Sequence, residues 1–388
     1  MTRAILASRL QTITSPASVT MAAAVRAMKQ QGLHVIDLGW GEPVFDTPAF
    51  VRERAKQALD EGDTHYTPSA GLETLRRAIS VKLAEDNRLQ YDWSTEILVT
   101  PGAKQAIYYA LFTILDPGDE VLTFEPGWLS YNDLIRMNGG VPVPITGRRE
   151  DNFLPDPATI EQRISDRTKA IVINSPVNPT GAVWPRNLLE AVASVAERHD
   201  LLVVADEIYE GVLYDGVEHV SIASLPGMRE RTIVINGLSK VAAMTGWRLG
   251  YAAAPEGILE GMLKVHQQIA TCAGSFVQTA AVEALAKRQA VREALLPRYQ
   301  RCRDVIVAGI NSTRRLSCTR PQGAFYLLMN IERLGLDAVA ASRLLLEKVQ
   351  LATVPGTAYG PPGEGHVRLS YALAEQDLHI AIERLHTL

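Results

Sequence analysis

Three groups of polar side chains, each placed directly after a short apolar run, could together perform chemistry. The first group offers the amide of Asn178, the second the carboxylate of Asp206 and the phenol of Tyr209, and the third the hydroxyl of Ser239 and the ammonium of Lys240. These are the groups needed to hold a planar, phosphorylated cofactor whose ring withdraws electrons. The spacing therefore indicates a cofactor site built from three neighbouring segments.

Pyridoxal 5′-phosphate is a cofactor of this description, and each residue type has a physical role toward it. A lysine must attack the cofactor's carbonyl as a free amine, and desolvation lowers the pKa of a lysine readily, which suits Lys240. The ring nitrogen must stay protonated, and this requires a facing carboxylate such as Asp206. The phosphate needs backbone N–H groups at a helix start, a hydroxyl and a guanidinium, which are available at Gly102-Ala103-Lys104, Ser239 and Arg248.

A sheet must position these groups. Short runs rich in β-branched residues alternate with amphipathic helical stretches, and the runs are residues 97–99, 120–122, 170–173, 201–205 and 232–235. Strands without polar alternation, separated by helices, are typical of a mostly parallel sheet covered on both faces. Ligands of such sheets bind beyond the carboxyl ends of the strands, which is where the three polar groups fall.

The last hundred residues have a different pattern. Helical segments at 282–312 and 338–348 flank short strands at 324–329 and 366–370. This arrangement predicts a second, mixed α/β domain. The sequence contains no fixed-period repeat and no linker rich in Ser, Gly or Pro, so we expect the two domains to be closely docked.

Composition excludes several classes of protein. The 388 residues are 47% hydrophobic and carry 39 Lys and Arg against 43 Asp and Glu, a formal net charge of −4. This balance argues against a disordered chain and against a surface that binds nucleic acid by neutralising phosphates. No apolar run approaches the roughly 18 to 20 residues of a membrane span. Three widely separated cysteines favour a reducing compartment, and we expect a cytoplasmic protein without a metal site.

The first 36 residues contain no Asp or Glu, which superficially resembles an organellar transit peptide. No apolar signal core or small-residue cleavage pattern accompanies this feature. We therefore expect an N-terminal arm and helix followed by a strand at residues 35–38.

On its motifs the chain resembles the class I/II aminotransferases, the aspartate-aminotransferase-like enzymes of pyridoxal-phosphate fold type I. The motifs appear in the order of the family and span roughly residues 10 to 385. The resemblance implies a large cofactor-binding domain at 46–285, with a sheet of the seven-stranded type, and a small domain formed by 1–45 and 286–388. The matching motifs are Gly41-Glu42-Pro43-Val44-Phe45-Asp46-Thr47-Pro48, Tyr66 followed by Gly71, Asn174-Ser175-Pro176-Val177-Asn178-Pro179-Thr180-Gly181, Asp206-Glu207-Ile208-Tyr209, Ser239-Lys240 with Met244-Thr245-Gly246-Trp247-Arg248, and Val367-Arg368.

The resemblance also implies roles around the cofactor. Lys240 is similar to the Schiff-base lysine that moves the substrate's α-proton, and Asp206 to the partner of the ring nitrogen. Asn178 and Tyr209 resemble the residues that bind the ring phenolate, and Trp128 matches the aromatic that stacks on the ring.

Further roles concern the substrate and the assembly. Arg368 resembles the arginine whose planar fork holds the substrate's α-carboxylate, assisted by the backbone of Gly41 and by Asn178. Tyr66 resembles the tyrosine that reaches the phosphate in a partner subunit, which implies a homodimer with shared active sites. Trp40, before Gly41, is large for a residue that borders the substrate pocket, and it either narrows that pocket or packs beneath it.

Structural interpretations stand beside these roles. Asp206 and Ser239 could cap helices, Trp128 could fill the core, and Arg368 could form a surface ion pair. The eight histidines show no paired metal spacing.

The substrate hypothesis depends on Lys104. One prokaryotic aspartate-aminotransferase subgroup has a similar Gly-x-Lys-Gln-Ala stretch whose lysine faces the substrate's distal carboxylate, and Ser18 loosely matches a hydroxyl residue of that subgroup. By this analogy we expect aspartate or glutamate as amino donor and a 2-oxo acid as acceptor, in a ping-pong cycle. Alternatively, Lys104 only supports the helix and the phosphate.

Other reactions could use the same residues. The alternatives are a transaminase for neutral, aromatic or basic amino acids, and a C–S lyase, a cyclising synthase or an amino-acid oxidase of the same fold. A DNA-binding regulator with an aminotransferase-like domain is disfavoured, because the resemblance begins near residue 10.

Overall fold

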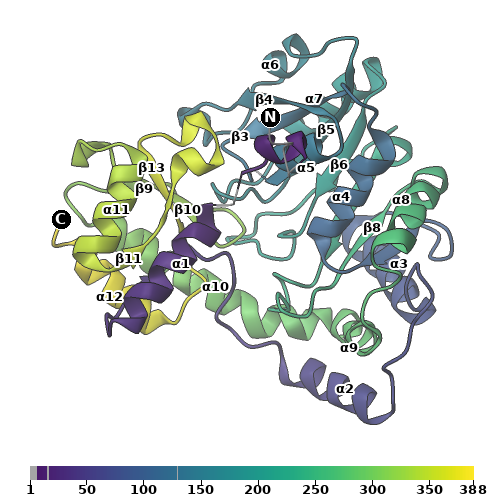
Figure 1. Ribbon diagram of the computed structural model, residues 1–388, viewed down its shortest axis with the longest axis horizontal. Coiled ribbons are helices and arrows are strands. Elements are labelled where there is room, and N and C mark those ends of the chain that lie inside the picture. The colour runs from purple at the N-terminus through teal and green to yellow at the C-terminus, as the bar shows by residue number, and fades with distance from the viewer. Residues whose placement is uncertain (1–6, 15–16, 129) are drawn as a thin grey trace, which may run out of the picture.

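A seven-stranded sheet forms the centre of the larger part of the chain in the computed structural model, which describes residues 7–14, 17–128 and 130–388 (Figure 1). The strand order is β2-β8-β7-β6-β5-β3-β4, and all strands run parallel except β8, which is antiparallel to both of its neighbours. This confirms the expected α/β fold. The strands are β2 (Ile97–Thr100), β3 (Glu120–Glu125), β4 (Val141–Thr146), β5 (Thr168–Asn174), β6 (Leu202–Asp206), β7 (Thr232–Gly237) and β8 (Gly250–Ala253).

Helices cover both faces of this sheet because its strands are apolar on both sides. Along β6, Val204 packs into the cluster that contains helices α4 (Ala103–Ile114) and α8 (Glu256–Ile269), whereas Val203 packs into the cluster of α7 (Arg186–Arg198). The remaining helices of this part are α2 (Ala49–Asp60), α3 (Glu73–Asn87), α5 (Ser130–Met137), α6 (Pro157–Gln162) and α9 (Ser275–Ala286).

The smaller part of the molecule combines both ends of the chain. Strand β1 (Ile36–Asp37) pairs in parallel with β11 (Leu351–Ala352), and an antiparallel sheet has the order β12-β13-β10-β9. Its strands are β9 (Ser317–Cys318), β10 (Tyr326–Asn330), β12 (Val354–Pro355) and β13 (His366–Ser370), and its helices are α1 (Ala17–Gln30), α11 (Ala338–Val349) and α12 (Glu375–Leu385). The domain boundaries given above remain a prediction.

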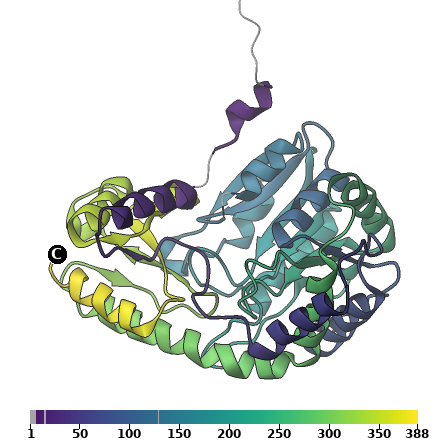
Figure 2. The same cartoon turned by 60° about the horizontal axis from the view of Figure 1, so that its bottom comes forward.

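Helix α10 (Arg288–Asn311) runs along one side of the molecule and joins the two parts (Figure 2). The single helix predicted at 282–312 is wrong, because α9 ends at Ala286 and the backbone leaves the helical conformation at Lys287, with φ −107° and ψ 28°. The strand predicted from residue 324 begins only at Tyr326, because Ala324 has a φ of +56°.

Short 3₁₀ segments complete the secondary structure: η1 (Ser8–Thr12), η2 (Arg149–Asp151), η3 (Ile222–Ser224), η4 (Arg229–Arg231), η5 (Glu332–Leu334), η6 (Gly356–Tyr359) and η7 (Pro361–Gly363). Within the described residues, no helix combines the length and the apolar character needed to cross a membrane.

Candidate active site

A cavity of about 490 Å³ opens where β5, β6 and β7 end and the two parts of the molecule meet. Segments that are far apart in the sequence supply its walls. Nearly all of the predicted site residues line it: Trp40, Gly41, Ala103, Lys104, Trp128, Asn178, Asp206, Tyr209, Ser239, Lys240, Arg248 and Arg368.

Asp206 is the last residue of β6 and is 4% exposed. Its Oδ2 accepts a hydrogen bond of 2.6 Å from the hydroxyl of Tyr131, and its Oδ1 accepts one of 3.2 Å from the backbone of Ile208. Burial raises the pKa of this carboxyl to about 6, while the Tyr131 bond opposes the rise. A turn rather than a helix follows, so Asp206 is not a helix cap. Its carboxylate is therefore available to face a cationic ring nitrogen.

Lys240 approaches the cavity from the loop after β7. Its Nζ donates a hydrogen bond of 2.6 Å to the backbone oxygen of Gly41, and its own backbone oxygen accepts one of 2.9 Å from Tyr299. Burial lowers the pKa of Lys240 to about 8, and the nearby Glu42 carboxylate opposes that shift. A substantial fraction of the side chain is thus a free amine slightly above neutral pH, as a nucleophile requires.

Asn178 lies in the loop after β5, next to cis peptide bonds at Ser175–Pro176 and Asn178–Pro179. Its backbone N–H donates to the side chain of Asn174 at 3.0 Å, and Asn174 in turn donates to the backbone oxygen of Asp206 at 3.0 Å. The side-chain oxygen of Asn178 is buried and has no partner. An unpaired amide at the cavity wall is suited to a ligand, because leaving it unpaired is unfavourable.

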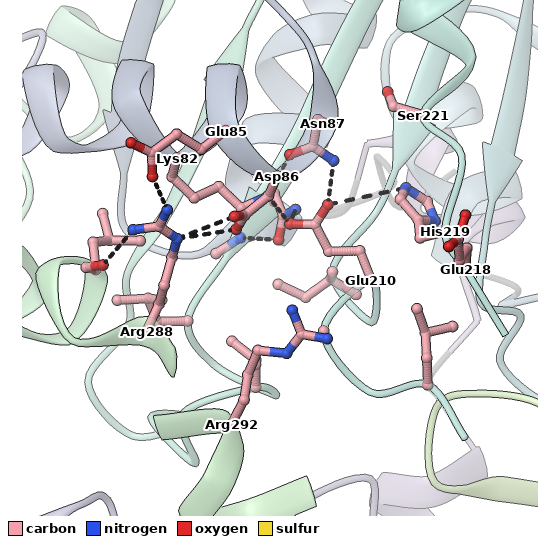
Figure 3. Close-up of a pocket in the computed structure, with 18 of the residues that line it drawn as sticks. Lys82, Glu85, Asp86, Asn87, Glu210, Glu218, His219, Ser221, Arg288 and Arg292 are labelled. Atoms are coloured by element: carbon pink, nitrogen blue, oxygen red, sulfur yellow. Dashed lines mark hydrogen bonds and ion pairs between the residues drawn. The ribbon is translucent and has the colours of Figure 1, made fainter. Parts of the chain in front are cut away.

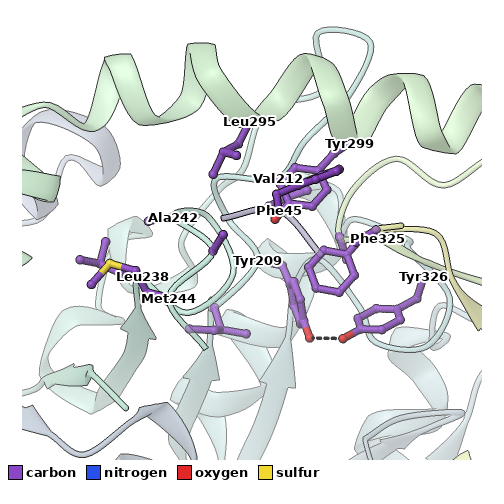
Figure 4. Packing of buried hydrophobic residues seen from close by; sticks show 14 of the residues in the cluster. Phe45, Tyr209, Val212, Leu238, Ala242, Met244, Leu295, Tyr299, Phe325 and Tyr326 are labelled. Atoms are coloured by element: carbon purple, nitrogen blue, oxygen red, sulfur yellow. Dashed lines mark hydrogen bonds between the residues drawn. The ribbon is translucent and has the colours of Figure 1, made fainter. Parts of the chain in front are cut away.

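Two phenols, one from each part of the molecule, meet on the cavity wall. The hydroxyls of Tyr209 and Tyr326 lie 2.9 Å apart, and Figure 4 shows both rings beside Phe325, in the packed aromatic cluster that also contains Tyr299. Burial raises the pKa of both Tyr209 and Tyr326, so both remain protonated hydrogen-bond donors at neutral pH.

Arg368 comes from β13 and is only 3% exposed, which excludes the surface ion pair considered above. Its guanidinium lies 4.7 Å from the ring centre of Tyr326 and donates a hydrogen bond to the backbone oxygen of Gly39. The Nε of Arg368 is buried without a partner. A buried guanidinium with an unused donor is suited to a planar carboxylate.

The start of α4 forms a cradle for an anion. Gly102 has a φ of +97°, and a Cβ atom at this position would collide with the guanidinium of Arg248. At Gly250, a Cβ atom would likewise collide with the backbone of Ala103. The two glycines thus allow Arg248 and the exposed backbone N–H groups of α4 to converge, and this arrangement favours a phosphate.

Lys104 and Trp128 lie together at the same end of the cavity. The Nζ of Lys104 is 4.7 Å from the ring centre of Trp128, and that ring meets the ring of Tyr131 edge-on at 5.0 Å. Burial and the neighbouring Arg248 lower the pKa of Lys104. Trp128 is half-buried on the cavity wall rather than enclosed in the core.

Among the described residues, two predicted ones, Gly102 and Tyr66, do not line this cavity, although Gly102 adjoins it at the start of α4. Tyr66 is 87% exposed on a loop outside it. The backbone of Ser18 belongs to α1, but its side chain lies outside the described part of the structure, so its prediction is untested. Trp40 is 42% exposed at the rim, and its Nε1 donates to Glu42 at 2.8 Å. It therefore borders the cavity without packing beneath it.

Residues to which the sequence analysis gave no role also line the cavity, among them Glu42, Tyr131, Thr245 and Tyr326. Thr245 donates a hydrogen bond to Glu42 and so connects the segment after β1 to the loop after β7. Glu42 and Thr245 belong to the motifs of Gly41 and Arg248 given above, and this proximity was the available signal. For Tyr131 the signal was its position three residues after Trp128.

Comparison with known proteins identifies relatives over almost the whole chain. The family described as aminotransferase class I and II matches residues 34–385. An aspartate aminotransferase of Pyrococcus abyssi is 44% identical over 90% of both chains. An aspartate/prephenate aminotransferase of Thermus thermophilus is 43% identical, covering 98% of this chain and 97% of the relative. A solved structure of aspartate aminotransferase from Thermus thermophilus with maleate superposes with a TM-score of 0.94 at 42% identity, covering 98% of this chain and 99% of the other.

Proposed function

The chain belongs to the class I and II aminotransferases and is an aminotransferase, and we propose that it binds pyridoxal 5′-phosphate and moves the amino group of aspartate or glutamate to a 2-oxo acid. One observation carries the proposal. The low-pKa amine of Lys240 faces the same cavity as the buried carboxylate of Asp206 and the buried guanidinium of Arg368.

The donor set of the cavity fits this cofactor. The side-chain amide of Asn178 and the two phenols offer donors for the ring phenolate, Asp206 offers a partner for the ring nitrogen, and the glycine-bordered start of α4 with Ser239 and Arg248 offers partners for the phosphate. When bound, pyridoxal 5′-phosphate supplies a carbonyl that accepts the amino group and a ring that stabilises negative charge at the α-carbon.

The protein's own residues perform the remaining tasks. Arg368 binds and orients the substrate's α-carboxylate through its planar fork. Lys240, as the free amine, takes the proton from the α-carbon and later returns one as general acid. Asp206, held ionised by the hydroxyl of Tyr131, keeps the proton on the ring nitrogen. The two half-reactions use the same site in turn, which gives ping-pong kinetics.

Lys104 supports the choice of a dicarboxylic substrate. It is a second cation of the cavity, separate from Arg368, so the two carboxylates of aspartate or glutamate would each have a cationic partner. Two of the relatives are named for aspartate. Trp40 at the rim favours the alternative, an aromatic substrate, because its ring could stack on one.

A donor panel with one pair of variants tests the substrate. Lys104→Ala should lower kcat/KM for aspartate about tenfold or more relative to alanine, because it removes one charged contact. Lys264→Ala is the matched control, since Lys264 is a surface lysine paired with Glu260 on α8. An unchanged ratio of aspartate to alanine turnover in Lys104→Ala would refute the dicarboxylate assignment, and faster turnover of aromatic donors would select the alternative.

The proposal includes a cytoplasmic homodimer with shared sites, in which Tyr66 reaches the partner's cofactor. The 87% exposure of this aromatic residue in the single chain supports an additional contact surface, and the three free cysteines support a reducing compartment. Co-expression of Tyr66→Ala with Lys240→Ala chains tests the sharing. If the sites are shared, a mixed dimer contains one intact site and should regain about half of the wild-type activity. If each chain supplies both residues to its own site, the mixed dimers should have no activity.

A further inference from the structure

A second buried polar cluster lies on the reverse side of the turn that carries Asp206 and Tyr209. Along this turn, Asp206 and Tyr209 face the active-site cavity, whereas Glu207 and Glu210 line or adjoin a separate cavity of about 380 Å³. Their side chains are 4% and 13% exposed. Two carboxylates therefore lie on the side of the turn that faces away from the active-site cavity.

Glu210 connects this turn to two other elements. It forms an ion pair with Lys82 of α3 and accepts hydrogen bonds of 2.6 Å from Asn87 and 2.7 Å from Asn236. Figure 3 shows the Glu210 carboxylate with Lys82 and Asn87 beside it. Asn236 lies near the end of β7, the strand that leads into the Lys240 loop. Its side-chain oxygen also accepts a hydrogen bond of 2.7 Å from the backbone N–H of Gly237. Glu210 thus links the Asp206 turn to the Lys240 loop.

Lys82 alone does not balance the two carboxylates, and His219 is the second cationic group. Its Nε2 lies 3.3 Å from Glu207 and 4.0 Å from Glu210, and its side chain is 7% exposed. Burial by itself would lower the pKa of His219, but the two carboxylates outweigh burial and raise it. Among the described residues, only Glu207 and Glu210 lie within ion-pair distance of this imidazole.

We propose that His219, as an imidazolium between Glu207 and Glu210, is a positioning residue for Asp206 and Tyr209 on the opposite side of the same turn. The inference rests on the proposed function, because it concerns the cofactor-facing groups of that site. With a neutral residue at 219, two buried carboxylates whose nearest atoms lie within 4.8 Å of each other would share one ammonium. The repulsion between the two carboxylates would displace the turn or cause one of them to bind a proton. Because Glu207 directly adjoins Asp206, either change would reach Asp206.

The surroundings of His219 bear on its titration. Lys82 faces it from α3, and Glu207 and Glu210 face it from the turn. Tyr251 of β8 also lines the cavity and lies near the two carboxylates, and its phenol stays neutral because burial raises its pKa. The other charged groups of the cavity are Glu85, Asp86 and Arg88 near the end of α3, Arg186 of α7, Arg288 and Arg292 of α10, and Glu218. The nearest charges to the imidazole are thus the two carboxylates, which favour its protonated form.

The first test reads the charge directly in the cofactor-free protein. Nuclear magnetic resonance of ¹⁵N-histidine-labelled chain, with the signal assigned by its loss in His219→Gln, should show that His219 keeps both ring protons to a higher pH than His266, whose pKa burial lowers. Loss of the His219 proton at the same pH as that of His266, or at a lower pH, would overturn the proposal. Neither result depends on the reaction that the protein catalyses.

The second test measures the affinity of the cofactor-free protein for pyridoxal 5′-phosphate by fluorescence titration. His219→Gln should raise Kd about tenfold at pH 7, and His219→Lys, which keeps the charge, should restore most of the affinity. The difference between wild type and His219→Gln should shrink as pH rises through the raised pKa of His219, because the wild-type imidazole then loses its proton too. His266→Gln is the control, since His266 is a fully buried histidine whose pKa burial lowers.

Equal Kd values in wild type and His219→Gln would refute the positioning role while leaving the aminotransferase assignment intact. Failure of wild type to bind the cofactor would instead refute the cofactor proposal. If His219→Gln does not fold, the comparison of His219→Lys with wild type decides: a Kd within about threefold supports the charge, and a larger rise contradicts it.

Discussion

The Nζ atom of Lys240 donates a hydrogen bond of 2.6 Å to the backbone oxygen of Gly41, a residue 199 positions earlier in the chain. The contact joins the loop after β7 in the larger part of the molecule to the segment after β1 in the smaller part. It places the amine at the boundary where Arg368 and Asp206 also converge on the cavity.

Replacing Lys240 should separate activity from stability. Lys240→Met should lower transamination by about 10³-fold or more, because the nucleophile and general base are lost. The cofactor-free variant should nevertheless be more stable than wild type at pH 7, by up to about 3 kcal/mol, because burial lowers the pKa of Lys240 from 10.5 to about 8.

The pH dependence of this stability difference has a definite sign. Between pH 8 and 10.5 the unfolded chain binds the Lys240 proton more tightly than the folded chain does, so wild-type stability gains as pH rises through this window. The advantage of Lys240→Met should therefore be complete below about pH 8 and nearly absent by pH 10.5. Urea unfolding at pH 7 and pH 10 measures it, and a variant less stable than wild type at pH 7 would contradict the burial cost.

Tyr131→Phe should weaken cofactor binding mainly at acidic pH. The hydroxyl of Tyr131 stabilises the ionised form of Asp206, so its loss should raise the pKa of that carboxyl above about 6. At pH 6 the Kd for pyridoxal 5′-phosphate should rise about tenfold, and at pH 8 much less. Tyr108→Phe, on the same side of the sheet but outside the cavity, is the control. A loss of affinity that is independent of pH would argue against this role.

Arg368→Lys should impair substrate binding without affecting the cofactor. A lysine keeps the charge but loses the planar fork, so KM should rise about 10- to 100-fold for every amino donor. The Kd for pyridoxal 5′-phosphate should stay within about twofold. Arg320→Lys, at a 53% exposed side chain, controls for the substitution itself. If KM rose for dicarboxylic donors alone, Arg368 would instead bind the distal carboxylate.

Gly102→Ala should destabilise the protein and its phosphate cradle together. Its φ of +97° disfavours any side chain, and the added Cβ would meet the guanidinium of Arg248. We expect a loss of at least about 1 kcal/mol in the free energy of unfolding and a higher Kd for the cofactor. Gly257→Ala is the matched control, because nothing lies within 4 Å of the position of its Cβ. A wild-type Tm and Kd in Gly102→Ala would contradict the cradle.

Local pattern predicted much of the fold, and its failures have physical causes. Buried parallel strands such as β5 and β6 are continuous apolar runs and could be recognised directly. Strand β4 could not, because Pro142 and Pro144 obscure an edge strand, and β8 is a short Gly-Tyr-Ala-Ala segment in an antiparallel position.

The candidate site divides in the same way. Lys240, Asp206 and Asn178 follow strands, so their convergence could be predicted from topology. The partners Tyr131 and Tyr326 reach Asp206 and Tyr209 from 75 and 117 positions away. Only the tertiary structure brings such residues together, and no local spacing indicates it.

A single turnover tests the central claim most directly. Enzyme loaded with pyridoxal 5′-phosphate is mixed with aspartate in the absence of a 2-oxo acid, and the products are quantified per active site. Transamination predicts one equivalent of the corresponding 2-oxo acid, retention of the amino group on the cofactor, and no release of ammonia. Release of ammonia, with or without consumption of oxygen, would contradict this account and assign the site to a lyase or an oxidase.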